Sequence, residues 1–432
     1  MDRLSKKSSN VRSSEVIVVG GGVIGCSIAY HLAGRGQAVT VLERGRTGSE
    51  ASAAAAGMLG AQSEMEDTGL LFQWARRSRA MFPQLAEELK ALTGIGIGLV
   101  REGLLNVALT DVQEEELRAR EKLQRAAGEQ AEWLSAAAAA RLEPALSQAV
   151  RGALYLPDDG QVEAPLLAQA FAQAARILGA NVQEFAQVQK LLTEQGKAIG
   201  VMTSDGPIYG DRVIVASGTW SGQLLADVGV ELPVYPVKGE CFSVLTPKPV
   251  LSKTLFTPGC YIVPKAGGRL LVGATVQPGS YDRKVSLAGL AELMERAKLL
   301  MPSIAETEWE KAWSGLRPQT PDGLPYIGMV PEVEGLYAAY GHYRNGILLS
   351  PITGKVMADL ILGDDSEQEA DTQLELDLEP TRQEPQLKPW LDAFCPDLSG
   401  HSKRAGHRGQ GPTKQEQGRE VGKELHIIEA AH

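Results

Sequence analysis

Val16–Arg44 reads VIVVGGGVIGCSIAYHLAGRGQAVTVLER, and it is the most informative stretch of the 432-residue chain. The apolar, β-branched run Val16–Val19 predicts a buried strand, and Ala38–Leu42 predicts a second one. Between them, residues 20–25 fit the pattern G-x-G-x-x-G and open an apolar helix that extends to about Ala33. A strand, a glycine-rich turn, a helix and a second strand in this order predict a unit that binds a dinucleotide.

Each glycine of this motif has a physical task. Gly20 permits the tight turn, Gly22 lets the backbone approach a pyrophosphate, and Gly25 lets the helix pack closely on the strand. The start of the helix offers unpaired N–H groups to the anion. Glu43 lies eighteen residues past Gly25, where an acidic side chain bonds a ribose 2′-hydroxyl and repels a 2′-phosphate. The motif therefore disfavours NADP.

Composition excludes several classes of protein. The net charge of −10 argues against non-specific binding of nucleic acid. No apolar run reaches the roughly 20 residues that span a bilayer, so we expect no membrane insertion. The polar N-terminus lacks the apolar core of a signal peptide, and we expect a cytoplasmic protein.

Cysteine and histidine usage limits the chemistry. None of the four cysteines forms a C-x-x-C pair, which argues against a zinc site or a disulfide framework. Only His31 and His342 lie outside the last 35 residues. The rest of the chain therefore has too few histidines to favour a histidine-based catalytic triad or a histidine-rich metal site. We expect no metal, and a cofactor must carry the reaction.

The order of the predicted elements indicates an α/β protein, α+β overall, with two discontinuous domains. A nucleotide-binding domain takes residues 15–90, 144–225 and 310–363, with a helix at Pro165–Leu178. A substrate-binding domain takes residues 91–143 and 226–309. Its composition predicts a long helix at Ala119–Arg141 and an inserted antiparallel sheet whose strands lie near 100–110, 241–246, 260–265 and 269–276. Residues 364–432 form an acidic and polar tail that we expect to be largely disordered.

Two C-terminal segments carry the remaining chemistry. Trp313–Gly328 is stiff with glycine and proline and contains Arg317. Leu336–Gly354 predicts a strand, then a glycine-bearing loop with Arg344, then a helix that extends to about Leu362. The start of that helix would stabilise the negative charge of a reduced flavin.

Seven short motifs show a resemblance to a known family. The chain resembles the D-amino-acid oxidase family of FAD enzymes and, within it, the branch of glycine oxidases that serves bacterial thiamine biosynthesis. The resemblance spans about Glu15 to Gly363. The motifs are SAAAAGMLGA at 52–61, VKGEC at 237–241, CYIVP at 260–264, VGAT at 272–275, GLRP at 315–318, DGLPYIG at 322–328 and GHYRNGILLSP at 341–351.

The resemblance implies a fold, a cofactor and an assembly. It implies a glutathione-reductase-like, FAD-binding Rossmann domain with an inserted antiparallel-sheet substrate domain. It implies that FAD is bound non-covalently and that the protein forms a homotetramer.

The resemblance also implies roles for matching residues. Arg317 would clamp the substrate carboxylate, Tyr261 would add its hydroxyl to the same group, and Arg344 would line the pocket near the amino acid and the flavin. The residues expected to contact FAD are Gly20, Gly22, Val23, Ile24, Gly25, Glu43, Arg44, Ala51, Ser52, Ala56, Gly57, Met58, the backbone near Val188, and His342, Tyr343, Arg344, Asn345, Gly346, Ile347 and Leu348 along the flavin ring.

The activity implied is the oxidation of glycine, and also of sarcosine and small D-amino acids. An amino acid with a neutral amine would give its α-hydrogen as hydride to the flavin, and dioxygen would reoxidise the flavin to yield hydrogen peroxide. Iminoacetate would feed thiazole formation, which implies a functional link to a thiazole synthase. Gly259 and Val276 stand where the branch often has histidine and methionine, so a sarcosine or D-amino-acid enzyme remains an alternative. A flavin-binding protein without turnover is the other.

Overall fold

The computed structural model describes residues 16–65 and 68–363. It shows a mixed α/β protein, as predicted, in which the elements of two large sheets alternate along the chain. The polar N-terminus and the predicted tail at 364–432 lie outside the described residues. In the part that is described, no helix is both long and apolar enough to cross a membrane.

The first sheet has six strands in the order β19-β20-β12-β1-β2-β8. β1 pairs in parallel with β2 on one side and with β12 on the other, as the sequence predicts for a nucleotide-binding unit. All four residues of β1 are buried, because helices pack on one face of the sheet, and a small three-stranded sheet with one short helix packs on the other. The strands are β1 (Val16–Val19), β2 (Val39–Leu42), β8 (Asn181–Gln183), β12 (Arg212–Val215), β19 (Tyr326–Met329) and β20 (Leu336–Tyr340).

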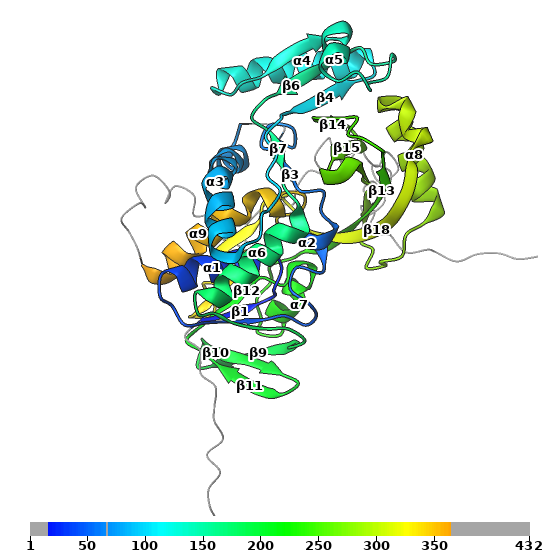
Figure 1. Cartoon of the computed structure of the whole chain (residues 1–432). Coiled ribbons are helices and arrows are strands. Elements are labelled where there is room, and N and C mark those ends of the chain that lie inside the picture. Colours follow the sequence, from blue (N-terminus) through cyan, green and yellow to red (C-terminus); the bar gives the residue numbers. More distant parts are fainter. Residues whose placement is uncertain (1–15, 66–67, 364–432) are drawn as a thin grey trace, which may run out of the picture. The chain divides into compact units, whose positions relative to one another are not determined.

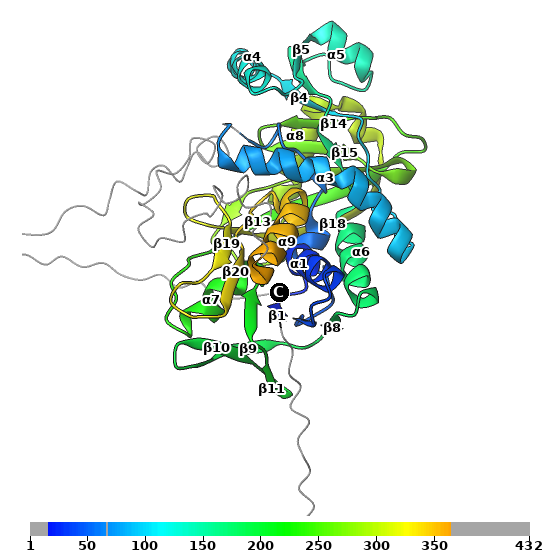
Figure 2. The ribbon, with the colours of Figure 1, turned by 90° about the vertical axis from the view of Figure 1, so that its left-hand side faces the viewer.

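Four helices pack around this sheet in one apolar core. They are α1 (Val23–Gly34), α3 (Leu70–Thr93), α6 (Ala164–Ile177) and α9 (Gly346–Leu362), and the predicted helices at 165–178 and up to 362 are confirmed. α1 and α9 lie side by side (Figures 1 and 2). The two helices approach closely at Gly354, where a Cβ atom would lie 2.3 Å from Ser27 Oγ.

The second sheet has nine strands and is antiparallel except for the pair of β14 with β4. Its hairpin of β15 and β16 turns through Gly267 and Gly268, both at positive φ, as the sequence predicts. The strands are β4 (Leu104–Ala108), β5 (Glu132–Ser135), β6 (Gly152–Leu156), β13 (Tyr235–Leu245), β14 (Thr254–Thr257), β15 (Cys260–Pro264), β16 (Arg269–Gly273), β17 (Gln277–Pro278) and β18 (Glu308–Gln319).

Smaller elements complete the described chain. They include a three-stranded sheet, a two-stranded sheet and short helices: β9 (Val188–Glu194), β10 (Lys197–Thr203), β11 (Gly206–Tyr209), β3 (Met58–Leu59), β7 (Gly160–Gln161), α2 (Ala51–Ala54), α7 (Ser221–Ala226), α8 (Leu287–Leu300), and the 3₁₀ turns at 218–220, 266–268 and 302–306.

The helix predicted at Ala119–Arg141 is confirmed at its two ends and wrong in its middle. The chain forms α4 (Asp111–Ala126), then β5, then α5 (Ala136–Leu142). Gly128 adopts a positive φ of 84° and ends the helical path. Trp133 then packs so closely on Gly152 of β6 that a Cβ atom there would lie 2.3 Å from its ring. Strand pairing and this contact outweigh the helix propensity of the segment.

The proposed domain ranges cut across the sheets. β6 lies in the range 144–225 and most of β18 lies in the range 310–363, yet both strands belong to the nine-stranded sheet. The two-domain division remains a proposal. Sheet membership would assign these two segments to the substrate-binding part.

A buried carboxylate ties the segment after β3 to α3. Asp159 is fully buried and accepts hydrogen bonds from the backbone N–H groups of Gln62 and Ser63. Arg79 Nη1 lies 2.7 Å from Asp159 Oδ1. Burial raises the pKa of the Asp159 carboxyl, while Arg79 and the two N–H groups oppose the shift. The segment at 62–63 is thus held by charge-assisted bonds.

We predict that Asp159→Ala lowers the free energy of unfolding by about 3–5 kcal/mol. The buried Arg79 would keep Glu129 but lose its other carboxylate partner, and the N–H groups of Gln62 and Ser63 would lose their acceptor. Glu334→Ala is the matched control. Glu334 pairs with Lys197 on the surface, where the side chains are 69% and 58% exposed, and its removal should change the free energy by less than about 1 kcal/mol. Urea unfolding measures both variants, and equal effects would contradict the assignment.

Candidate active site

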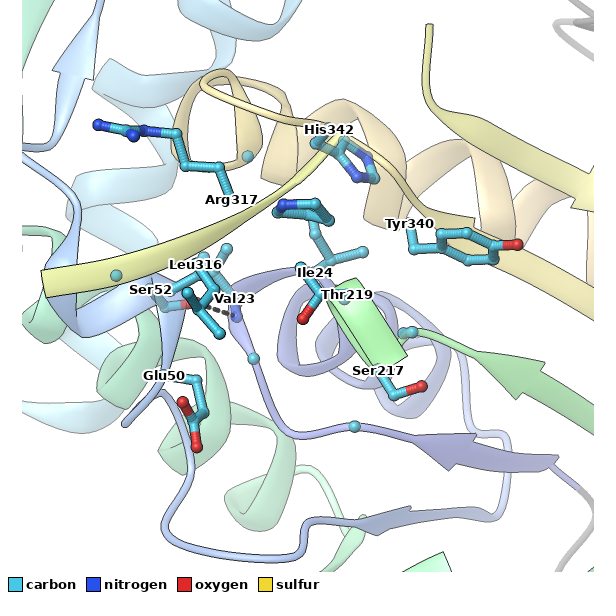
Figure 3. Close-up of a pocket in the computed structure, with 18 of the residues that line it drawn as sticks. Val23, Ile24, Glu50, Ser52, Ser217, Thr219, Leu316, Arg317, Tyr340 and His342 are labelled. Atoms are coloured by element: carbon cyan, nitrogen blue, oxygen red, sulfur yellow. Dashed lines mark hydrogen bonds between the residues drawn. The ribbon is translucent and has the colours of Figure 1, made fainter. Parts of the chain in front are cut away.

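A cavity of about 470 Å³ opens at the carboxyl ends of β1, β2 and β12, within the size range of small-molecule sites. Its walls come from both large sheets (Figure 3). Ligands of doubly wound sheets bind at this edge because the connecting loops diverge there. Most residues predicted for the site line this cavity: Gly20, Gly22, Val23, Ile24, Glu43, Arg44, Ala51, Ser52, Ala56, Gly57, Met58, Val188, Tyr261, Arg317, His342, Tyr343, Arg344, Asn345, Gly346 and Ile347.

The glycine-rich turn leaves no room for side chains. Gly20 has a φ of 110°, and a Cβ atom on it would lie 2.6 Å from the carbonyl oxygen of Ala216. Gly25 does not line the cavity. It packs against the backbone of the turn, since a Cβ atom there would lie 1.9 Å from the Gly20 carbonyl oxygen. It serves helix packing, the task that its place in the motif predicts.

Glu43 has two backbone partners beside the cavity. Its carboxylate accepts a hydrogen bond from Gly21 N–H and one from Gly45 N–H, each at 2.8 Å. The side chain is buried and holds the turn in shape while it lines the cavity. Its contact with a ribose stays a prediction.

The start of α1 is oriented by a distant side chain. Ser52 Oγ accepts a hydrogen bond from Val23 N–H at 3.0 Å, and Figure 3 shows this bond beside Ile24. The other N–H groups of the first helical turn are available to an anion.

Arg44 lies over the ring of Trp220, with Cζ 3.6 Å from the ring centroid, and pairs with Glu50 at 3.0 Å. All three side chains line the cavity, and the cation–π contact helps to hold Arg44 there. The sequence analysis missed Trp220 and Glu50. The motif ASGTW after β12 was a usable signal for the tryptophan.

Arg317 projects from β18 into the opposite end of the cavity (Figure 3). Its Nη1 donates to the carbonyl oxygen of Thr275 at 3.3 Å. The guanidinium lies against Gly239, where a Cβ atom would be 2.1 Å from Nη1. Only glycine therefore leaves space for this orientation. In the described part of the chain, no carboxylate forms an ion pair with Arg317.

Tyr261 lies beside Arg317 in the same part of the cavity. Its hydroxyl is 3.6 Å from Cys241 Sγ, and Gly273 makes room for it, since a Cβ atom there would lie 2.4 Å from the hydroxyl oxygen. Burial, with Cys241 nearby, raises the pKa of Tyr261 well above its ordinary 10.0. The hydroxyl keeps its proton and can act as a hydrogen-bond donor.

Arg344 belongs to the loop before α9, lines the cavity and pairs with Glu64. The Nε–Oε2 distance is 2.7 Å and the Nη2–Oε1 distance is 2.9 Å. Burial lowers the pKa of the guanidinium, but the facing carboxylate more than offsets this, and the pKa is raised. Glu64 is a cavity residue that the sequence analysis did not single out.

The loop from β20 to α9 presents its backbone to the cavity. Tyr343 has a φ of 48°, a conformation that non-glycine residues rarely adopt and that clusters at functional sites. His342 Nε2 lies 3.0 Å from Thr353 Oγ1 in a fully buried position, and burial lowers its pKa from 6.5 to about 3. His342 is therefore neutral near pH 7.

A few predicted residues lie elsewhere. Leu348 packs in the apolar core and does not line the cavity. Gly259 and Val276, the two departures from the motif, are also absent from its lining. Gly259 lies against Arg296 instead, since a Cβ atom there would be 1.8 Å from that guanidinium.

Comparison with known proteins identifies the family. The model of the DAO family, described as FAD dependent oxidoreductase, matches residues 15–360. The chain belongs to this family. The predicted D-amino-acid oxidase family is thus confirmed, and FAD is its cofactor.

Relatives with known names cover nearly the same region. A glycine oxidase from Geobacillus kaustophilus is 49% identical over 349 residues, which are 80% of this chain and 92% of the relative. A crystal structure of glycine oxidase from that organism has a TM-score of 0.80, 49% identity, and coverage of 82% of this chain and 95% of that chain. A bifunctional protein ThiO/ThiG from Synechocystis is 35% identical, and the match covers 81% of this chain but 52% of that protein.

The cavity fits FAD. The glycine-rich turn forms a cradle that side chains would fill, and the start of α1 faces it. Thr219 Oγ1 is buried at the cavity wall without a hydrogen-bond partner among the described residues, as expected for an atom that bonds a cofactor. Gly20, Gly22 and Glu43 would hold the nucleotide end.

We predict that Gly239→Ala displaces the Arg317 guanidinium without unfolding the protein, because the atoms it meets are the end of a flexible side chain. Binding of acetate, followed by the flavin absorbance spectrum, should weaken by at least about tenfold, because a hydrogen bond to a charged group contributes roughly 1.5–3 kcal/mol. Gly96→Ala is the control, since a Cβ atom there meets nothing within 4 Å. Unchanged acetate binding in Gly239→Ala would contradict the geometry.

We predict that His342 makes the fold less stable in acid. The unfolded chain binds a proton at this histidine as the pH falls below about 6.5, whereas the folded chain does so only near pH 3. Stability contributed by neutral His342 is therefore lost between these values as the pH falls. His342→Gln should flatten the decline of the urea midpoint between pH 6.5 and pH 3. Parallel declines in both proteins would show that His342 does not titrate as described.

Proposed function

We propose that this chain oxidises glycine to iminoacetate with FAD and dioxygen, and that it also accepts sarcosine and small D-amino acids. The observation that carries the proposal is the position of Arg317. It lies without an ion-pair partner among the described residues, in the same cavity as the dinucleotide turn. The identity of 49% to a glycine oxidase supports glycine as the substrate.

The carboxylate of glycine would bind at Arg317. A guanidinium presents two parallel N–H groups that match the two oxygens of a carboxylate. The Tyr261 hydroxyl, which keeps its proton, would donate to the same group. Two fixed donors leave the α-carbon few orientations, and restricted orientation lowers the barrier of the next step.

The reaction removes a hydride from the α-carbon and a proton from the nitrogen of H₂N–CH₂–COO⁻, which leaves HN=CH–COO⁻. FAD supplies a two-electron acceptor, which dioxygen reoxidises with formation of hydrogen peroxide. The chain's residues bind and orient the substrate and exclude water. His342 is neutral and hydrogen-bonded to Thr353, and Glu64 is paired with Arg344, so neither side chain is placed as a free base.

The product suggests a partner. A relative described as ThiO/ThiG joins a ThiO-like half to a second half in one chain. We propose that iminoacetate passes from this enzyme to a thiazole synthase. The homotetramer and the cytoplasmic location stay predictions, to be checked by light scattering and by fractionation.

Anaerobic flavin bleaching tests the function. The purified protein should release intact FAD on denaturation, and glycine should bleach its flavin absorbance without dioxygen. Sarcosine, D-alanine and D-proline complete the panel. A faster reaction with sarcosine or a D-amino acid would favour the alternative substrate. Failure of every amino acid to bleach the flavin would support a binding protein without turnover.

We predict that Arg317→Ala keeps its FAD but loses at least about 30-fold in kcat/KM for glycine, because truncation of a hydrogen-bonded charge pair costs roughly 2–5 kcal/mol. Arg317→Lys should recover only part of this, since an ammonium lacks the planar fork. Stopped-flow flavin reduction measures both. Near-normal kcat/KM in Arg317→Ala would move the carboxylate site to Arg344.

A further inference from the structure

Two arginines line the substrate end of the cavity, but they differ in their partners. Arg317 donates to a neutral carbonyl oxygen of Thr275. Arg344 faces a carboxylate, Glu64, through two of its nitrogens. A substrate therefore meets one cation with spare binding capacity and one that is already neutralised.

The pair of Arg344 and Glu64 is well enclosed. The side chains are 17% and 9% exposed, and both nitrogen–oxygen distances lie in the range of charge-assisted hydrogen bonds. Arg344 also lies near the ring of Phe256, with Cζ 5.9 Å from its centroid. In such surroundings the charges are weakly screened, and the pair is costly to separate.

The backbone that carries Glu64 is itself fixed. Gln62 N–H and Ser63 N–H both donate to the buried Asp159 carboxylate. Glu64 N–H donates to the Gly60 carbonyl oxygen at 3.1 Å, and a Cβ atom on Gly60 would lie 3.0 Å from Glu64 Cγ. Glu64 is therefore held toward Arg344 rather than free to move aside.

We propose that Glu64 determines substrate specificity: by occupying Arg344, it makes the site exclude amino acids with an acidic side chain. A second carboxylate would have to face the Glu64 carboxylate and would find no free cation, since Arg317 already holds the first. Unpaired like charges in a poorly screened cavity reject a ligand more strongly than lost contacts do. Glu64 is a positioning residue that acts through Arg344, and the inference rests on the proposed function.

The test compares D-aspartate with D-asparagine, two molecules of nearly equal shape that differ in the charge of the side chain. For each protein we would measure the ratio of kcat/KM for the two, or of their inhibition constants against glycine where neither is oxidised. Glu64→Gln should raise this ratio in favour of D-aspartate at least about tenfold, since a bond between a carboxylate and a freed guanidinium exceeds the roughly 1.4 kcal/mol that a tenfold change represents.

Further variants separate the charge effect from a change in folding. Glu64→Asp keeps the negative charge and should keep the preference for D-asparagine. The double variant Glu64→Gln, Arg344→Gln removes both charges and should lose the gain of the single variant. Glu310→Gln is the matched control, because Glu310 forms a similar two-bond pair with Arg269 outside the cavity lining, and its ratio should equal that of the unmodified protein.

An unchanged ratio in Glu64→Gln, including equal exclusion of both compounds, would overturn the proposal. So would an equal gain in Glu310→Gln or in the double variant. Binding of the two compounds can also be followed by the flavin spectrum without turnover. A failure of glycine to reduce the flavin of the unmodified protein would therefore refute the proposed function, while the charge preference would still be measured independently.

Discussion

The cavity forms where it does because β1 pairs in parallel with β2 and β12. This pairing brings the carboxyl ends of three strands to one edge of the sheet. The chain must leave each strand there, and at β1 it does so through Gly20, whose φ of 110° and closeness to Ala216 exclude any side chain. The cavity exists because this turn is tight and the loops around it diverge.

The nine-stranded sheet contributes Arg317 and Tyr261 to the cavity. β18 pairs with β13 over most of its length, and this register sets Arg317 opposite Val237, next to Gly239. The missing side chain of Gly239 is as important as the arginine, because the guanidinium occupies its space. Arg317, on a strand of the nine-stranded sheet, thus lies in the cavity at the edge of the six-stranded sheet.

Charge in the cavity is arranged by pairing and by burial. Arg344 is neutralised by Glu64, His342 is kept uncharged by burial, and Tyr261 keeps its proton. Arg317 is the guanidinium here that has no ion-pair partner among the described residues. A site with this balance suits a ligand with one carboxylate, which is consistent with an amino acid whose remaining atoms are small.

Part of this structure follows from local rules and could be predicted from the order of the amino acids. Backbone sterics at Gly20 and Gly25, the apolar run of β1 and the stiff segment around Arg317 predicted the nucleotide unit and the family, and most of the named residues line one cavity. The rest depends on contacts between segments that are separate in the chain. β5 interrupts the predicted helix where it pairs with β6 and Trp133 packs on Gly152. Glu64 lies in the cavity wall because Asp159, 95 positions away, holds the backbone of the preceding residue, Ser63. Such contacts join residues distant in the chain, and neither propensity nor spacing encodes them.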